Sequence, residues 1–142
     1  MKKLNIEELP DLAQEIREFI VDVVSRIPGH LASNLGVVEL TIALHYTFDF
    51  LKDKLIWDVG HQSYVHKILT GRREAFSTLR QYKGLSGFPN KKASEYDPFI
   101  CGHGGHAISA ALGLSCADNI NGVNRKIVAV VGLGYVGLPL AF

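Results

Sequence analysis

Two short runs of apolar, β-prone residues, each followed by a glycine, place the tightest limit on the fold. The runs are Leu55–Val59, ahead of Gly60, and Lys126–Val131, ahead of Gly132. Both predict strands, and the second is apolar throughout, which is typical of a central parallel strand. Helical patterns fill the sequence between them, so the alternation predicts an α/β fold. We expect the two strands to lie parallel and the loops after them to open at one edge of the sheet.

The helical patterns have clear ends. Apolar residues recur at helical spacing from Leu12 to Ile27, and Pro28-Gly29 ends that pattern. In the last predicted helix, Ile108 and Leu112 share a face with small residues, and we expect that face to pack on the sheet. Further helices are predicted over Val37–Thr47, Tyr64–Leu69, Arg73–Tyr82 and Ala107–Asn119, with loops over His30–Asn34 and Lys83–Gly105.

Composition excludes several classes of protein. The 142 residues include 15 basic and 14 acidic side chains, a net charge of +1, which gives no reason to expect a nucleic-acid or membrane partner. Cys101 and Cys116 do not form a disulfide framework, so a reducing compartment is expected. No apolar run is long enough to cross a bilayer, and no apolar signal segment follows the first lysines. We expect a cytoplasmic protein.

Glycine and histidine gather in four loops. Glycine allows a backbone to approach a phosphate, and histidine can donate a hydrogen bond to it or carry protons near neutral pH. These histidines could equally be ordinary loop residues, and spacing alone does not decide. His45 is expected in the core, and His66 at the surface or in packing. The four loops are Gly29–Gly36, Asp58–Gln62, Gly84–Pro89 and Gly102–His106.

A collinear series of motifs resembles the 1-deoxy-D-xylulose-5-phosphate synthase family. It includes Gly-His-Leu-Ala-Ser-Asn-Leu-Gly from Gly29, Trp-Asp-Val-Gly-His-Gln from Trp57 and Gly-Leu-Ser-Gly-Phe-Pro from Gly84, and it covers residues 9–131. The resemblance implies a transferase of the transketolase type, which condenses pyruvate with glyceraldehyde 3-phosphate and releases carbon dioxide. It implies thiamine diphosphate and Mg²⁺ as cofactors. Residues 1–131 would then be an incomplete diphosphate-binding domain with a parallel sheet flanked by helices.

The resemblance also assigns site residues. His61 matches a residue at the diphosphate end of the cofactor, and His30 matches a catalytic histidine that faces the substrate. Gly102, His103 and Gly104 match positions that line the cofactor. Members of the family are dimeric, so a homodimer, or pairing with a chain that carries the missing domains, is implied.

The sequence departs from the family at two places. Gly105-His106 stands where the family has hydroxyl side chains, and Leu133 stands where it has the aspartate that binds Mg²⁺. Leucine offers no oxygen to a hard cation, so we assign no metal ligand. We therefore expect weak or absent cofactor binding and no activity from this chain alone.

The end of the sequence has a second resemblance. Gly132, Gly134 and Gly137 fit the dinucleotide fingerprint, and residues 130–141 are similar to the opening of nucleotide-sugar dehydrogenases. On this interpretation residues 132–142 are a strand-to-helix glycine turn rather than a domain.

Three other functions remain open from the sequence. The chain could be a non-catalytic binding or assembly module, or one half of a split enzyme. It could hold a metal through Cys101, His103 and His106, although that spacing is not a standard site. It could also be a fragment of an NAD-dependent nucleotide-sugar dehydrogenase.

Overall fold

The computed structural model describes residues 2–132, which divide into two compact units. Among these residues, the first unit contains 2–49 and 61–87, and the second contains 50–60 and 88–132. In the described range no helix has the length and apolar character needed to cross a membrane.

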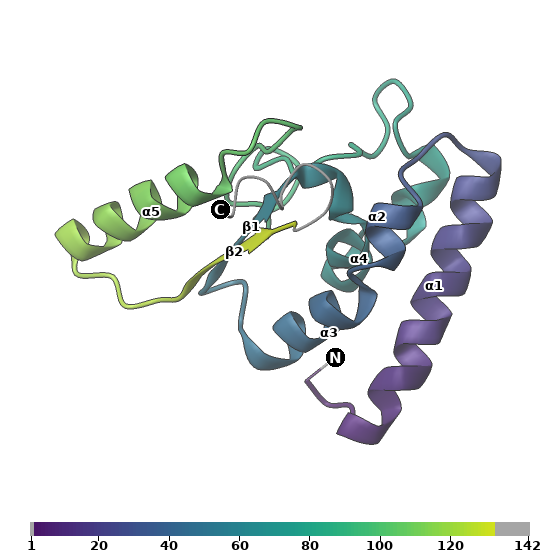
Figure 1. Ribbon diagram of the computed structural model, residues 1–142, viewed down its shortest axis with the longest axis horizontal. Coiled ribbons are helices and arrows are strands. Elements are labelled where there is room, and N and C mark those ends of the chain that lie inside the picture. The colour runs from purple at the N-terminus through teal and green to yellow at the C-terminus, as the bar shows by residue number, and fades with distance from the viewer. Residues whose placement is uncertain (1, 133–142) are drawn as a thin grey trace. The chain divides into compact units, whose positions relative to one another are not determined.

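The first unit is helical. Its longest helix, α1, lies alongside α3 (Figure 1). Pro10 lies in the first turn of α1, where its missing N–H costs nothing. The elements are a 3-10 turn Ile6–Glu8, α1 Leu9–Arg26, α2 Ala32–Leu35, α3 Val38–Thr47, α4 Tyr64–Lys67, a π turn Ile68–Arg72 and a 3-10 turn Glu74–Thr78.

This unit encloses its own apolar core. One face of α1 supplies Ala13, Ile16 and Ile20, which are at most 5% exposed. Phe76 packs edge-on against Phe19 and Tyr64, with ring centroids 5.6 and 5.8 Å away. The other buried members of the core are Val38, Ile42, Val65, Ile68 and Leu79.

A pair of histidines joins α3 to α4 inside the first unit. His45 Nε2 lies 2.9 Å from His66 Nδ1, and His66 is 1% exposed. Burial, followed by the charges of His66, Arg72 and Lys2, lowers the pKa of His45 to about 3. His66 is therefore a packing residue. His45, which the sequence places in the core, is half-buried, neutral and hydrogen-bonded.

The second unit contains a two-stranded parallel sheet. Strands β1, Lys54–Asp58, and β2, Ile127–Val131, pair in register from Lys54 opposite Ile127 to Asp58 opposite Val131. Helix α5, Ala107–Asn121, packs beside both strands (Figure 1). The helix ends at Asn121 and is capped by Gly122, whose φ of +65° suits glycine.

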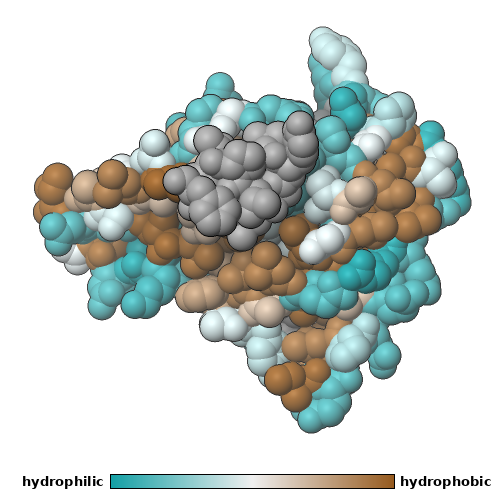
Figure 2. All heavy atoms as spheres, viewed as in Figure 1, coloured by the Kyte–Doolittle hydropathy of each residue, from teal (hydrophilic) through white to brown (hydrophobic). Residues whose placement is uncertain are grey.

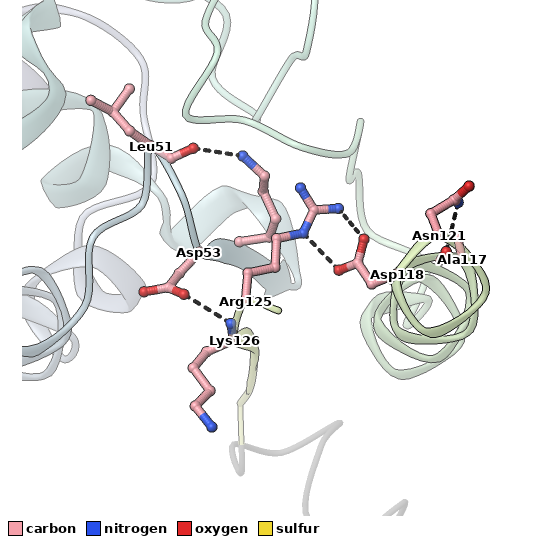
Figure 3. A network of polar contacts seen from close by, with 8 residues as sticks. Leu51, Asp53, Ala117, Asp118, Asn121, Arg125 and Lys126 are labelled. Carbon is pink, nitrogen blue, oxygen red and sulfur yellow. Dashed lines mark hydrogen bonds and ion pairs between the residues drawn. The ribbon is translucent and has the colours of Figure 1, made fainter. Parts of the chain in front are cut away.

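Polar contacts fasten α5 and the start of β2 (Figure 3). Arg125 donates two hydrogen bonds of 2.6 Å to the carboxylate of Asp118 near the end of α5. The backbone N–H of Lys126 donates to Asp53 Oδ1 at 2.8 Å, just before β1 begins. These bonds fix the turn that carries the chain from the helix back into the sheet.

The predicted α/β class with a parallel sheet is confirmed. Three local predictions are wrong. The expected loop His30–Asn34 contains the start of α2, and the helix expected over Arg73–Tyr82 ends at Thr78, because Leu79 is extended and Arg80 has a φ of +59°. Ile108 and Leu112 of α5 do not pack on the sheet but are 65% and 64% exposed.

Candidate functional site

His30 and His61 lie together in the first unit. Their ring centroids are 4.9 Å apart and the rings meet edge to face at 70°. Both side chains are partly exposed. Since His30 precedes α2 and His61 lies in the 3-10 turn Gly60–Gln62, two loops distant in sequence converge on one imidazole pair. The structure thus brings together the predicted catalytic histidine and the predicted diphosphate-contacting histidine.

Asn34 holds this pair in place. Its side-chain amide donates to the backbone carbonyl of His30 at 2.6 Å and to that of His61 at 2.8 Å. Its Oδ1 accepts a 2.8 Å hydrogen bond from the backbone N–H of Tyr64. Asn34 is fully buried, so the loss of this side chain would leave polar backbone groups without partners. One amide therefore sets the distance between the two histidine loops.

The Tyr64 side chain contacts the backbone at His30. Its hydroxyl accepts a 3.3 Å hydrogen bond from the backbone N–H of His30. A Cβ atom added to Gly29 would lie 3.2 Å from this hydroxyl, so glycine permits the close approach. The glycine before His30 thus positions the histidine through the backbone.

The loop Gly102–Gly105 closes on the end of β1 in the second unit. Gly60 donates its N–H to the carbonyl of Gly102 at 3.0 Å. A Cβ on Gly60 would come within 2.2 Å of the Cys101 carbonyl oxygen, a distance that no other residue type can accept. Cys101 is buried and donates its S–H to the carbonyl of Trp57 at 2.7 Å. Burial, and then the charge of Asp58, raises the pKa of the Cys101 thiol.

A carboxylate occupies the N-terminus of α5. Asp58 Oδ1 accepts a 3.3 Å hydrogen bond from the backbone N–H of Ala107, and a Cβ on Gly105 would lie 3.4 Å from Asp58 Oδ2. A negative charge here stabilises the positive end of the helix dipole. The ring of His103 packs edge-on against Phe88, with centroids 5.4 Å apart. The predicted cofactor-lining residues Gly102, His103 and Gly104 therefore lie in a loop built around Gly60 and Asp58.

The donors at these loops suit an anionic group better than a metal ion. His30 and His61 can donate to phosphate oxygens, whereas residues 2–132 contain no cluster of three or more His, Cys, Asp or Glu side chains arranged to hold a metal. The described residues therefore offer hydrogen-bond donors to a phosphate group and no such cluster for a metal ion. The alternative metal site at Cys101, His103 and His106 gains no support, because Cys101 is engaged with Trp57. Leu133 lies outside the described residues.

Sequence reasoning missed two residues that build these loops. Asn34 was part of the quoted motif, but nothing in the sequence shows that its amide reaches the carbonyl of His61, 27 residues further along the chain, as well as that of His30. Asp58 lies inside the predicted strand Leu55–Val59 and is the last residue of β1, and a carboxylate at the carboxyl end of a strand is a recognisable signal.

Comparisons with known proteins agree with one another. The family model described as 1-deoxy-D-xylulose-5-phosphate synthase matches residues 1–142. Curated relatives with that name include proteins of Azobacteroides pseudotrichonymphae, 56% identical over all of this chain, and of Alkaliphilus oremlandii, 60% identical over 99% of it. A third, from Syntrophomonas wolfei, is 57% identical over all of the chain.

Coverage limits what these matches imply. The chain spans only 22% to 23% of the length of these relatives. The matches run through residues 132–142, so the resemblance of that segment to nucleotide-sugar dehydrogenases finds no support.

Proposed function

Because this chain belongs to the 1-deoxy-D-xylulose-5-phosphate synthase family, we propose that it supplies one wall of the cofactor and substrate site of such a synthase. The complete enzyme would join pyruvate to glyceraldehyde 3-phosphate with loss of carbon dioxide. The observation that carries the proposal is the pair His30 and His61, held by the single buried amide of Asn34.

The two histidines have different roles in this proposal. His61 would donate a hydrogen bond to a phosphate oxygen of thiamine diphosphate, and Gly102, His103 and Gly104 would line the cofactor. When bound, this cofactor supplies the stabilised carbanion that the condensation needs. His30 would face the substrate and transfer a proton, a role that suits an imidazole near neutral pH. Asn34 would act only as a positioning residue.

The isolated chain would not perform the reaction. Leu133 stands where the family has its metal-binding aspartate, and a hard cation needs oxygen ligands. We expect thiamine diphosphate with Mg²⁺ to bind weakly or not at all in calorimetry. Micromolar affinity of the 142-residue chain would contradict this part of the proposal.

A chimera tests the catalytic assignment. This chain would replace the matched segment of the Alkaliphilus oremlandii relative, and five-carbon product and carbon dioxide would be measured. We expect no product from the isolated chain, little from the chimera, and clear turnover after Leu133→Asp in the chimera. In that active chimera, His30→Ala should lower kcat by roughly 100-fold or more.

The matched control is Tyr82→Ala, since Tyr82 is an aromatic residue of the first unit that is 92% exposed. Its removal should leave kcat unchanged. Full activity of the Leu133→Asp chimera after His30→Ala would refute the catalytic role of the imidazole pair.

A second candidate is a non-catalytic assembly module or one half of a split enzyme. Leu133, which stands where the family has its metal-binding aspartate, favours it over an active chain. Product that forms only when a second chain carrying the missing domains is added would support the split enzyme. We also propose the cytoplasm as the compartment, because Cys101 and Cys116 are both free thiols.

A further inference from the structure

Arg17 of α1 contacts both α2 and α3 in the first unit. Its Nη1 donates a 2.7 Å hydrogen bond to the backbone carbonyl of Leu35, the last residue of α2. Its Nη2 lies 2.5 Å from each carboxylate oxygen of Glu39, in the first turn of α3. Helices α1 and α2 are in contact, and Figure 2 shows hydrophilic as well as hydrophobic spheres over them. One guanidinium therefore spans the junction between α2 and α3.

The two contacts of Arg17 differ in what they contribute. The side chain of Glu39 is 64% exposed, and although the hydrogen bond from Arg17 keeps the pKa of Glu39 below its usual value, an ion pair so exposed stabilises little. The carbonyl of Leu35 belongs to the last turn of a helix, where carbonyls lack a partner inside the helix. A charged donor makes a stronger hydrogen bond to it than a neutral one. The contact with Leu35 is therefore the one that restrains the backbone.

Helix α2 depends on such support because it is only four residues long. A single helical turn is not stable by itself, since few hydrogen bonds offset the entropy lost when its backbone is fixed. Its third residue is Asn34, the amide that bonds to the carbonyls of His30 and His61. Leu35 follows Asn34 directly, so a displaced Leu35 carbonyl would displace Asn34 as well.

We propose that Arg17 is a positioning residue that holds α2 through the carbonyl of Leu35. Through Asn34, it thereby fixes the geometry of the imidazole pair of His30 and His61. Within residues 2–132 Arg17 makes no hydrogen bond to either histidine, so its influence passes through α2. This inference rests on the proposed function, because the histidine pair has a catalytic role only there.

The side-chain amide of Asn34 gives the first test, because both of its hydrogen bonds report the position of α2. NMR would follow its hydrogen exchange, together with the imidazole signals of His30 and His61, in the isolated chain. Arg17→Met removes the guanidinium and keeps a flexible side chain, and Arg17 borders a hollow of about 330 Å³ that leaves room for it. We expect the exchange at Asn34 to accelerate at least about tenfold and both imidazole signals to shift. Unchanged exchange in Arg17→Met would overturn the proposal.

Two other residues of α1 supply the controls. Arg26 pairs with Asp22 within the same helix and is 72% exposed, so Arg26→Met removes a charge without releasing α2. Ile20 is fully buried, so Ile20→Val lowers the stability of the unit without removing a polar contact. Both variants should leave the Asn34 exchange and the imidazole signals as they are. If Ile20→Val changed them as much as Arg17→Met does, Arg17 would contribute stability alone and the proposal would fail.

Conservative variants separate the two contacts. Arg17→Lys keeps the charge, but a single ammonium group cannot reproduce the planar fork that reaches two acceptors. Glu39→Gln weakens only the exposed contact. The acceleration of exchange at Asn34 should therefore be largest in Arg17→Met, smaller in Arg17→Lys and smallest in Glu39→Gln. If Arg17→Met does not fold, the order of the other two variants decides, and an effect of Glu39→Gln as large as that of Arg17→Lys would overturn the proposal.

A double variant tests whether the effect passes through Asn34. Residues that act along one route show non-additive effects, whereas independent residues show effects that add. Arg17→Met should therefore shift the imidazole signals of His30 and His61 no further when Asn34→Ala is already present. Shifts that add in the double variant would show that Arg17 reaches the histidines by another route, and they would overturn the proposal.

The Leu133→Asp chimera connects the position of α2 with turnover. There Arg17→Met should lower kcat by about tenfold and change KM much less, because proton transfer depends on the orientation of the imidazole. Arg26→Met should leave kcat unchanged. Shifted imidazole signals in the isolated chain with an unchanged kcat in the chimera would keep the role of Arg17 and refute the proposed function of the histidine pair. A lowered kcat with unchanged imidazole signals would overturn the inference and leave the proposed function intact.

Discussion

The first unit hides its apolar side chains, whereas the second displays them. In the first, α1 turns one apolar face to a closed core and a charged face to solvent. In the second, α5 and β2 are apolar on sides that nothing within residues 2–132 covers. The difference shows that apolar side chains on the elements of the first unit pack internally, whereas several of those on α5 and β2 remain exposed among the described residues.

Removal of a core aromatic ring from the first unit should lower its stability strongly. Truncation of an exposed apolar residue in the second unit should change stability very little. Phe76→Ala deletes a ring packed on Phe19 and Tyr64 and should cost about 3–5 kcal/mol of unfolding free energy. Leu112→Ala should stay within about 0.5 kcal/mol. Urea denaturation followed by circular dichroism measures both, and comparable losses would erase the contrast.

Loss of the amide between the histidine loops should be the next largest effect. Asn34→Ala leaves two backbone carbonyls and one N–H without their partner and should cost roughly 2–3 kcal/mol. The matched control is Asn121→Ala on α5, whose exposed amide donates to the carbonyl of Ala117 within its own helix. NMR signals of His30 and His61 should also broaden or shift in Asn34→Ala alone. Unchanged histidine signals would show that Asn34 does not position them.

Acid should weaken the first unit through His45. Its pKa is about 3 in the folded chain against 6.5 for an ordinary histidine, so between these values the unfolded chain binds a proton that the folded chain refuses. Stability is therefore complete above pH 6.5 and falls as the pH drops toward 3, by up to about 1.4 kcal/mol per pH unit.

Urea denaturation should give a lower unfolding free energy at pH 5 than at pH 7 for the native chain. The difference between the two pH values should be smaller for His45→Gln. Asn121→Ala, which changes an exposed and uncharged residue of the second unit, should keep the native dependence of stability on pH. Identical slopes in all three proteins would remove His45 as the cause.

Ion pairs should show the smallest difference between the two units, and here the second unit should lose more stability than the first. Asp118→Asn weakens a bidentate, mostly buried pair with Arg125 and should cost about 1–2 kcal/mol. Asp22→Asn removes an exposed pair with Arg26 in α1 and should cost roughly 0.5 kcal/mol or less. Hydrogen exchange of α5 amides should accelerate only in Asp118→Asn.

Sequence periodicity predicted the elements but not their surroundings. Pro10 and the apolar stripe located α1, and the run at Lys126–Val131 located β2 and its parallel pairing. The same run predicted a central strand, but the described residues place β2 beside β1 alone. The apolar pattern of α5 led us to place Ile108 and Leu112 against the sheet, but both are exposed. Such a pattern shows that side chains favour burial, but it does not show which element covers them.

The sequence predicted the chemically active residues of the candidate site but not the residues that hold them in position. Resemblance and histidine chemistry together selected His30 and His61, which the structure places ring to ring. Asn34 and Asp58 depend on contacts with residues distant in sequence, and no local pattern encodes those contacts.

The parallel pairing of β1 with β2 has a consequence for synthesis on the ribosome. The bond from Lys126 to Asp53 joins residues 73 positions apart, so β1 leaves the exit tunnel long before its partner exists. At translation rates of about 5–20 residues per second, Leu55, Ile56 and Trp57 wait roughly 4–15 seconds without β2. During that interval residues 61–87 emerge and complete the helical core of the first unit. The nascent chain thus presents a completed helical core together with an unpaired apolar strand. Rapid synthesis of β2, or binding of a chaperone, would keep β1 from pairing with neighbouring chains.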